Sequence, residues 1–361
     1  MNVSGYFHPI DQPRRGGRLS RVEKAVKRVA KRTLTSRWMA HAWAPLIRDR
    51  VAFIMLHRFA EPEYQLFGHD RELFRRTLAR LRRDGYAMLT VEDAVRRLVE
   101  GHGFPQRSLV FTMDDGYRGA IEQCLDLLVE FDCPLTVFLP TGFIDGTCWL
   151  WWDQIEYVCL ESGRQSIDVP WQGSVFRLQL GGRDATIGTL LEICEWCKTL
   201  PDEEKWRFIG LLAEAAGVEI PRTAPPQYAP LTWPEVRALE AKGVVSFGPH
   251  TVTHPILPKA TDQAAAWEIT ESCARVRQEL ERPIDVFAYP NGAHGPREIE
   301  ILAQLGLRGA VTTRGDYARA ARRDAVPSAR FEIPRFGYPE APDPMVLIAS
   351  GFKSIELSLG R

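Results

Sequence analysis

The sequence predicts an α/β protein in which strands and helices alternate along most of the chain. Short apolar runs such as VAFIML (51–56) and SLVFTM (108–113) are rich in β-branched and aromatic residues, as is typical of strands buried on both faces. Segments with apolar residues at helical spacing separate these runs, and the two types do not segregate. This order predicts a parallel sheet with crossover helices, either open or closed into a barrel.

The composition fits one large domain of this class or two modest ones. The 361 residues are 45% hydrophobic and 25% charged, which is ordinary for a globular protein and argues against a disordered or collagenous chain. No apolar run approaches the roughly 20 residues that span a bilayer, and the N-terminus lacks the apolar core of a secretory signal. The seven cysteines are scattered and odd in number, so we expect reduced thiols.

Between residues 51 and 139 the expected elements follow one another without interruption. The expected strands are 51–56, 87–90, 108–113 and 135–139, and the expected helices are 70–83, 91–100 and 118–131. Asp84-Gly85 stops the first helix, and Thr90 caps the second. These are the repeating units of a parallel sheet.

Residues 160–230 interrupt the alternation, and we interpret them as an insertion that forms a lid or a substrate-side subdomain. Its expected elements are a strand-like stretch at 174–180, helices at 185–199 and 202–216, and a loop at 221–230. Cys194 and Cys197 fall within the first of these helices, so we interpret them as helix residues rather than as a zinc or redox pair. The alternation then resumes with helices at 232–242, 264–281 and 296–305, strands at 244–247, 286–289 and 310–312, and a last helix at 343–350.

The zero net charge conceals a basic N-terminal segment. Residues 1–50 hold 12 Lys and Arg against three acids, a net charge of +9, so the other 311 residues carry −9. Apolar residues between 19 and 34 recur at helical spacing opposite a basic face. The predicted helix either packs on the domain or lies on anionic lipid through residues 14–43. We expect a cytoplasmic protein, which in the second case contacts the inner face of the membrane; no nucleic-acid motif is present.

We therefore predict three parts. They are a basic N-terminal extension (1–50), the main α/β domain (51–345, with 160–230 inserted) and a C-terminal tail (346–361). Nothing in the sequence indicates an oligomeric state.

Two adjacent carboxylates follow the predicted strand 108–113. Asp114 and Asp115 stand just before Gly116, at the carboxyl end of a strand, where ligands of parallel sheets bind. Adjacent acids repel each other, and a cation relieves that repulsion. The alternative is a solvated Asp-Asp-Gly turn.

Two histidines follow another predicted strand. His250 and His254 stand four residues apart in HTVTH, a spacing that places both on one face of a helical turn and that zinc sites use. One Asp and two His would leave coordination positions open for water and substrate. A third motif, FAYPNG (287–292), again ends a strand. All three motifs are expected at the same edge of the sheet, a conjunction much rarer than any one of them.

Together these motifs resemble those of the polysaccharide deacetylases, the family with the NodB homology domain (carbohydrate esterase family 4). Residues 112–117 look like the family's T-F-D-D-G motif, with Met113 in place of the usual Phe. Residues 250–254 look like its H-[ST]-x-x-H motif, and 287–292 resemble the Tyr-Pro variant of its third motif. The resemblance spans about residues 51–340.

The resemblance implies an irregular (β/α)7 barrel, here with an inserted subdomain and an N-terminal basic helical extension. It implies a divalent metal, most often Zn²⁺, with Co²⁺, Mn²⁺ or Ni²⁺ as alternatives. Asp115, His250 and His254 carry over as metal ligands and Asp114 as the general base, while the backbone N–H of Tyr289 carries over as the oxyanion donor. The implied reaction is attack of an activated water on the amide carbonyl of an N-acetyl sugar, which releases acetate and a free amine.

The chain departs from the family pattern in its proton-handling residues. The third motif often begins with an Arg that orients the base, whereas Ala288 and its neighbours supply none; Arg335 could substitute from a later strand. No histidine follows His294, so the usual late Leu-x-His motif, which carries the general acid, is absent. We expect His57 or His294 to supply the acid, unless water or Asp114 shuttles the proton.

Several aromatic and polar residues near these motifs are candidates for substrate contact. We assign Tyr117, Asn291 and Trp152 to this group. Trp152 belongs to a cluster with Trp149 and Trp151, which either stacks on sugar rings or packs in the core.

These expectations define a metal-dependent hydrolase that removes N-acetyl groups from an amino sugar in a glycan, glycolipid or lipid-linked saccharide. Two alternatives remain. One is an O-deacetylase or another amide hydrolase that uses the same metal site. The other is a non-catalytic barrel that binds glycans, which the missing late histidine would permit.

Overall fold

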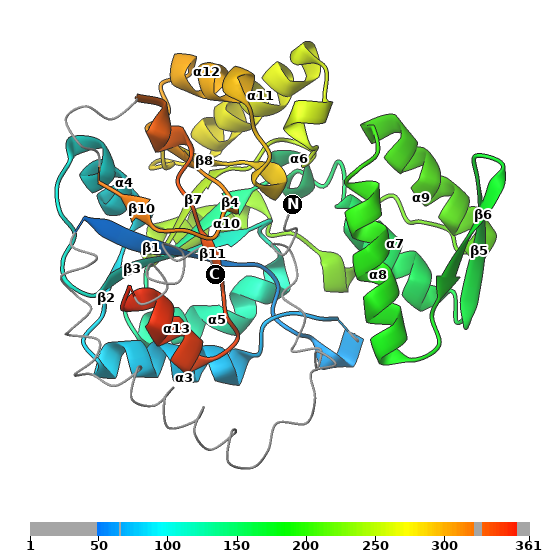
Figure 1. The fold of residues 1–361 in the computed structure, drawn as a ribbon, viewed down its shortest axis with the longest axis horizontal. Helices are drawn as coiled ribbons and strands as arrows, with labels where there is room; N and C mark the ends of the chain where they lie inside the picture. The colour runs from blue at the N-terminus through cyan, green and yellow to red at the C-terminus, as the bar shows by residue number, and fades with distance from the viewer. Residues whose placement is uncertain (1–48, 65, 321–326, 352–361) are drawn as a thin grey trace.

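The fold was described from a computed structural model that covers residues 49–64, 66–320 and 327–351. The predicted basic extension up to residue 48 and the predicted tail from residue 352 lie outside the described residues. Figure 1 shows a main body built around a central sheet, with a smaller unit beside it that contains α7, α8, α9, β5 and β6. Within the described ranges, no helix combines the length and the apolar character that a membrane span requires.

The main body contains one row of parallel strands. In hydrogen-bonded order they are β1 (Arg50–Leu56), β3 (Ser108–Asp114), β4 (Leu135–Leu139) and β7 (Val245–Pro249). Two short strands flank the amino ends of this row: β2 (Ala87–Leu89) pairs in parallel with β3, and β10 (Ala318–Arg319) pairs antiparallel with β1. The apolar runs that predicted these strands are buried along almost their whole length.

Three further short strands close the row into a ring. They are β8 (Val286–Ala288), β9 (Gly309–Val311) and β11 (Phe336–Gly337). The N–H of Ile284, just before β8, donates to the carbonyl of Phe247 in β7 at 3.0 Å. Strands β8 and β9 pair in parallel, Val311 bridges to Ile333, and β11 pairs in parallel with β1. The described strands therefore form an irregular barrel of seven parallel strands, which confirms the predicted fold class.

Helices surround this barrel. They are α3 (Arg71–Arg83), α4 (Val91–Glu100), α5 (Arg118–Glu130), α6 (Thr141–Ile144), α10 (Trp233–Ala241), α11 (Asp262–Glu279), α12 (Pro296–Gln304) and α13 (Pro342–Ala349). Single turns of 3-10 helix lie at Pro62–Tyr64, Pro226–Tyr228, Leu257–Lys259, Pro290–Gly292 and Pro327–Phe331. Figure 1 shows α3, α5 and α13 on one side of the sheet, and α11 and α12 on the other. Thr90 caps α4 as predicted, since its side chain accepts from the N–H of Asp93 at 3.1 Å.

The smaller unit overlaps the predicted insertion and has its own hydrophobic cluster. It comprises α7 (Trp151–Glu161), β5 (Ser166–Trp171), β6 (Ser174–Gln179), α8 (Arg183–Cys197) and α9 (Asp202–Ala216). Strands β5 and β6 form an antiparallel hairpin, of which the sequence predicted only the second strand. Pro170, which has no backbone N–H to donate, weakened the strand prediction for β5 although its polar and apolar residues alternate. Cys194 and Cys197 lie in α8 as free thiols, as predicted.

Candidate active site

The two carboxylates stand at the carboxyl end of β3, where the chain turns sharply. Asp114 is the last residue of the strand, and Asp115 and Gly116 both adopt the left-handed conformation, with φ of 76° and 73°. A Cβ on Gly116 would lie 2.6 Å from a methyl carbon of Leu139, so only glycine fits there. Asp115 holds a conformation that non-glycine residues rarely adopt. This turn aims the two carboxylates in different directions.

The histidines follow β7 in an irregular loop, which corrects the predicted helical turn. Residues 250–254 form no helix. Thr251 and His254 have φ of 67° and 58°, in the left-handed region, and the N–H of His254 donates to the Thr251 hydroxyl at 3.1 Å. The two imidazoles therefore face one point because the loop turns back on itself. Helical spacing does not bring them together.

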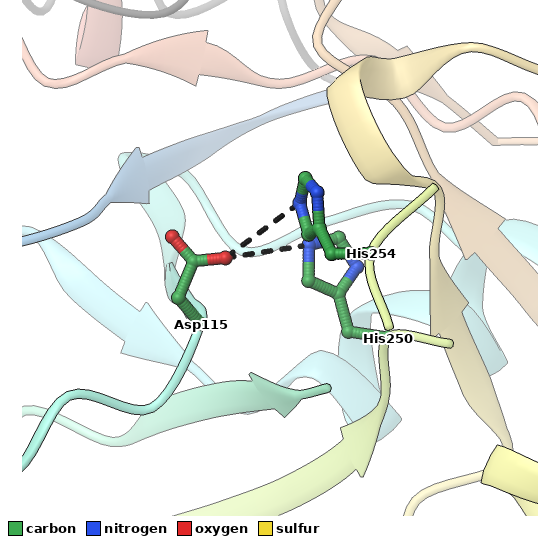
Figure 2. A group of neighbouring side chains, drawn as sticks. All are labelled: Asp115, His250 and His254. Atoms are coloured by element: carbon green, nitrogen blue, oxygen red, sulfur yellow. Dashed lines mark ion pairs between the residues drawn. The ribbon is translucent and has the colours of Figure 1, made fainter. Parts of the chain in front are cut away.

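Asp115, His250 and His254 converge on that point, as Figure 2 shows. Oδ1 of Asp115 lies 3.8 Å from Nε2 of His250 and 3.7 Å from Nε2 of His254. One potential ligand atom from each residue lies within 4.8 Å of the others, and all three residues are buried. Nδ1 of His250 lies 2.7 Å from the carbonyl of Ala288. It therefore carries the proton, and Nε2 keeps a free lone pair toward Asp115.

The electrostatics of this cluster fit a divalent cation. Oδ1 of Asp115 is buried and has no hydrogen-bond partner in the described part of the chain. Burial raises the pKa of Asp115 well above its usual value, and the charges of Asp114 and Asp153 raise it further. Burial also lowers the pKa values of His250 and His254, which keeps them neutral. One carboxylate oxygen and two neutral imidazole nitrogens are a donor set that zinc prefers, and a cation there would balance the buried charge.

Asp114 has a different partner. Its two oxygens accept from the two terminal nitrogens of Arg335, each at 2.7 Å. Arg335 is fully buried, and its Nε donates to the carbonyl of Thr312 at 2.9 Å. Burial raises the pKa of Asp114, but the charge and the hydrogen bonds of Arg335 outweigh it and hold that pKa below its usual value. The structure thus places Arg335 where it orients an ionised Asp114.

The two candidate acids lie in different surroundings. His57 directly follows β1, and its backbone N–H donates to Nε2 of His69 at 3.1 Å. Burial lowers the pKa of His57 to about 3, although the nearby charge of Asp114 raises it; His57 is therefore within electrostatic reach of Asp114. His294 stacks on Tyr289, with ring centroids 4.5 Å apart, and its Nδ1 lies 2.9 Å from the carbonyl of Gly292. Leu56 pairs with Met113 across β1 and β3, so His57 stands level with Asp114 at the strand ends, whereas His294 contacts Tyr289 and Gly292.

The third motif does not supply the expected oxyanion donor. The backbone N–H of Tyr289 donates to the carbonyl of Val311 at 3.2 Å, so it is already engaged where β8 meets β9. The Tyr289 ring packs in the apolar cluster that contains Phe287. Asn291, the neighbouring candidate for substrate contact, adopts a φ of 57°, and its side-chain amide nitrogen is buried without a partner in the described residues. The side chains of Asn291 and Tyr289 each retain a donor, whereas the backbone N–H of Tyr289 does not.

A buried ionic network beside the cluster was not predicted. The two terminal nitrogens of Arg58 each donate at 3.0 Å, one to Asp153 and the other to Glu156. The hydroxyl of Tyr117 donates to Asp153 at 2.6 Å and accepts from the indole N–H of Trp152 at 3.0 Å. The Tyr117 hydroxyl is therefore enclosed by this network and is not presented to substrate, contrary to expectation. The run Trp151-Trp152-Asp153, which weakly resembles some members of the deacetylase family, was the only sequence signal that pointed to this region.

Of the three clustered tryptophans, two pack in the core and one lies beside the candidate metal site. Trp149 and Trp151 are buried in the core. Trp152 is half-buried, and its ring meets the ring of His254 edge-on, at 4.6 Å between centroids. Trp152 therefore forms one wall of the candidate metal site.

Comparisons with known proteins agree with this description. The model of the polysaccharide deacetylase family matches residues 206–310, a range that contains His250 and His254 but not Asp114 or Asp115. No curated protein sequence matches the chain.

Solved structures of deacetylases share the fold. The deacetylase PplD of Streptococcus pyogenes, solved with acetate, superposes with a TM-score of 0.52 at 19% identity, over 83% of this chain and 98% of its own. IcaB from Ammonifex degensii gives 0.52 at 18% identity, over 84% and 97%. A polysaccharide deacetylase from Bacillus cereus gives 0.51 at 14% identity, over 83% and 69%. At these identities the likeness concerns the fold.

The family match and the fold together define a hydrolase that acts on carbon–nitrogen bonds. The family-model match and the shared fold both agree with the resemblance to polysaccharide deacetylases that the motifs indicated.

The Asp114–Arg335 pair leads to a stability prediction. Replacing Arg335 by Met leaves a buried carboxylate without its cation, which costs about 3–5 kcal/mol at neutral pH. Without Arg335, burial raises the pKa of Asp114 above its value in the unfolded chain. The loss of stability should therefore shrink as the pH falls and Asp114 takes up a proton. Urea unfolding at pH 7 and pH 5 measures both effects.

The matched control is Arg177→Met. Arg177 forms the same two-pronged contact, with Asp168 at 2.6 Å for both bonds, but on the exposed β5–β6 hairpin. Because solvent screens that pair, we expect little change. Equal losses in the two variants would contradict a special role for the buried pair.

The Tyr117 hydroxyl yields a second prediction. Tyr117→Phe removes both its donation to the buried Asp153 and its acceptance from the half-buried Trp152, and each of these groups loses that partner. We expect a loss of about 1–3 kcal/mol in the free energy of unfolding, measured in urea. Tyr86→Phe is the control, because the buried Tyr86 hydroxyl has no partner in the described residues. That variant should be neutral or more stable, and the reverse order would contradict the network.

Proposed function

We propose that this protein is a metal-dependent N-deacetylase of an amino sugar carried by a glycan, glycolipid or lipid-linked saccharide. The observation that carries the proposal is the Asp115–His250–His254 cluster standing next to an Asp114 that Arg335 holds ionised. Of the common divalent cations, zinc suits these donors best. The family match supports a carbohydrate as the class of substrate.

Asp115, His250 and His254 would hold the cation, and Asp114 would act as the base. A divalent cation in such a site polarises the substrate carbonyl and makes water acidic enough to react at neutral pH. Asp114 accepts a proton from the attacking water. Because both of its oxygens bind Arg335 at 2.7 Å, Asp114 is fixed in orientation, which favours a role as base over one as metal ligand.

His57 is the proposed source of the proton for the departing amine. An amine is a poor leaving group until it is protonated. The low pKa of His57 leaves its imidazole neutral in the free protein. The proton that Asp114 removes from water can then pass to His57, which donates it to the amine nitrogen. His57 thus acts as the general acid in place of the late histidine that the sequence lacks.

The test uses the full chain loaded with zinc and an oligosaccharide of N-acetylglucosamine, with released acetate and the free amine both measured. Asp114→Asn and His57→Gln should each lower kcat by about 10²–10⁴-fold, because each removes a proton-transfer group. His294→Gln should change kcat little, since its contacts lie outside the cluster. Loss of activity in His294→Gln alone would reverse the assignment of the acid.

Metal content separates this proposal from a purely glycan-binding barrel. Wild-type protein should bind one zinc ion per chain, and Asp115→Ala and His254→Ala should lose it. Hydrolysis of an O-acetyl ester without any release of amine from the N-acetyl sugar would point instead to an esterase on the same site.

We further propose that the basic extension brings the enzyme to anionic membranes, where lipid-linked substrates are found. The support is the net charge of +9 over residues 1–50, because each basic residue near an anionic surface contributes about 1 kcal/mol to binding. Flotation with phosphatidylglycerol vesicles should capture the full chain, and deletion of residues 1–48 should abolish capture. Equal capture of the two proteins, or equal binding to neutral vesicles, would contradict the proposal.

A further inference from the structure

A buried glutamate on α11 contacts the loop that joins the two histidines. Glu268 is only 5% exposed, and its Oε2 accepts from the backbone N–H groups of Val252 at 2.7 Å and Thr253 at 2.9 Å. The Thr253 hydroxyl donates to its other oxygen, Oε1. One carboxylate therefore receives three hydrogen bonds from the segment between His250 and His254.

The same segment is held on its other side by α6. The N–H groups of Thr141 and Gly142 donate to the carbonyls of Thr251 and Val252, both at 2.9 Å. The amide groups of the loop thus point to Glu268, and its carbonyl groups point to the start of α6. Between these two attachments the loop has little freedom to relax.

That restraint matters because the loop is strained. Thr251 and His254 are both in the left-handed region, which is unfavourable for a non-glycine residue and persists only where the surroundings enforce it. Without the bonds to Glu268, the N–H groups of Val252 and Thr253 would lose their partners. The loop could then relax toward ordinary backbone angles, and the imidazole of His254 would turn with it.

A buried carboxylate such as that of Glu268 is energetically unfavourable for a contact that is only structural. Burial raises its pKa, and the hydrogen bonds from the loop offset this only in part. A buried carboxylate needs such compensation, whereas an apolar side chain at the same place on α11 would not. Unlike an apolar side chain, a carboxylate can accept hydrogen bonds from two adjacent backbone N–H groups.

We propose that Glu268 is a positioning residue for the metal site. It holds the loop 250–254 so that Nε2 of both histidines faces Asp115 before any cation binds. The inference rests on the proposed metal dependence. It adds that Glu268, a residue of α11 that is not a ligand, contributes to the affinity for the metal. Residues that orient metal ligands typically contribute about 10–100-fold to affinity.

The test measures zinc affinity of the metal-free full chain by calorimetry in competition with a chelator. Glu268→Ala should weaken zinc binding about 10–100-fold. Glu268→Gln should stay close to wild type, because its amide oxygen can accept from both N–H groups while its NH₂ donates to the Thr253 hydroxyl. Glu268→Asp keeps the charge but shortens the reach, so it should weaken binding.

The matched control is Glu240→Ala. Glu240 is 8% exposed, and its carboxylate accepts from the backbone N–H groups of Glu281 and Arg282 at 3.3 and 3.1 Å. It is the same kind of contact, made to a different loop. Glu240→Ala should lower the unfolding temperature and leave zinc affinity unchanged.

The outcomes are distinguishable. If wild-type protein binds no zinc, the proposed function itself fails. If wild type binds zinc and folded Glu268→Ala binds it equally tightly, the positioning role is overturned while the metal site stands. If Glu268→Ala does not fold, the Asp and Gln variants decide the question. Binding that survives in Glu268→Asp but is lost in Glu268→Gln would show that charge matters and positioning does not.

Discussion

The site depends on two neighbouring carboxylates being buried at one strand end. Asp114 and Asp115 are each almost inaccessible to solvent, and two buried anions in sequence repel each other strongly. The chain separates their surroundings: the left-handed turn at Asp115 sends one carboxylate toward two imidazoles, and Arg335 neutralises the other. Two chemically identical groups thereby obtain different protonation behaviour, one suited to a cation and the other to proton transfer.

Much of the fold could be predicted because local patterns of apolar residues determine it. Apolar runs located β1, β3, β4 and β7, and the placement of Asp114, Asp115, His250 and His254 after strands predicted that they would meet. The ring closure was harder: the sequence predicted β8 and β9 as strands at 286–289 and 310–312, but not β11, which is only two residues long. A strand that short carries almost no periodicity, and its pairing depends on partners far along the chain.

The parts of the site that escaped prediction are those made by distant pairs. Arg58 and Asp153 are 95 residues apart, and neither type of residue signals a buried partner at that distance. Glu268 resembles any polar residue of an amphipathic helix until the loop against it is known. Arg335 was anticipated only because the family's third motif often supplies an arginine that this chain lacks at that position. Arg335 and Asp114 are 221 residues apart in the sequence. The occupied N–H of Tyr289 likewise depends on β9 and could not be foreseen from its own motif.

The ion network on α7 ties the smaller unit to the barrel. Arg58, at the end of β1, binds two residues of α7 that are three positions apart, and all three side chains are buried. Swinging the whole unit would expose or separate these charges, so α7 behaves mechanically as part of the barrel. Because α7 also shares one apolar cluster with α8, α9 and the β5–β6 hairpin, the network fixes these elements to the barrel as well. The wall that Trp152 gives to the metal site is therefore held from both sides: by the network and by the core of the smaller unit.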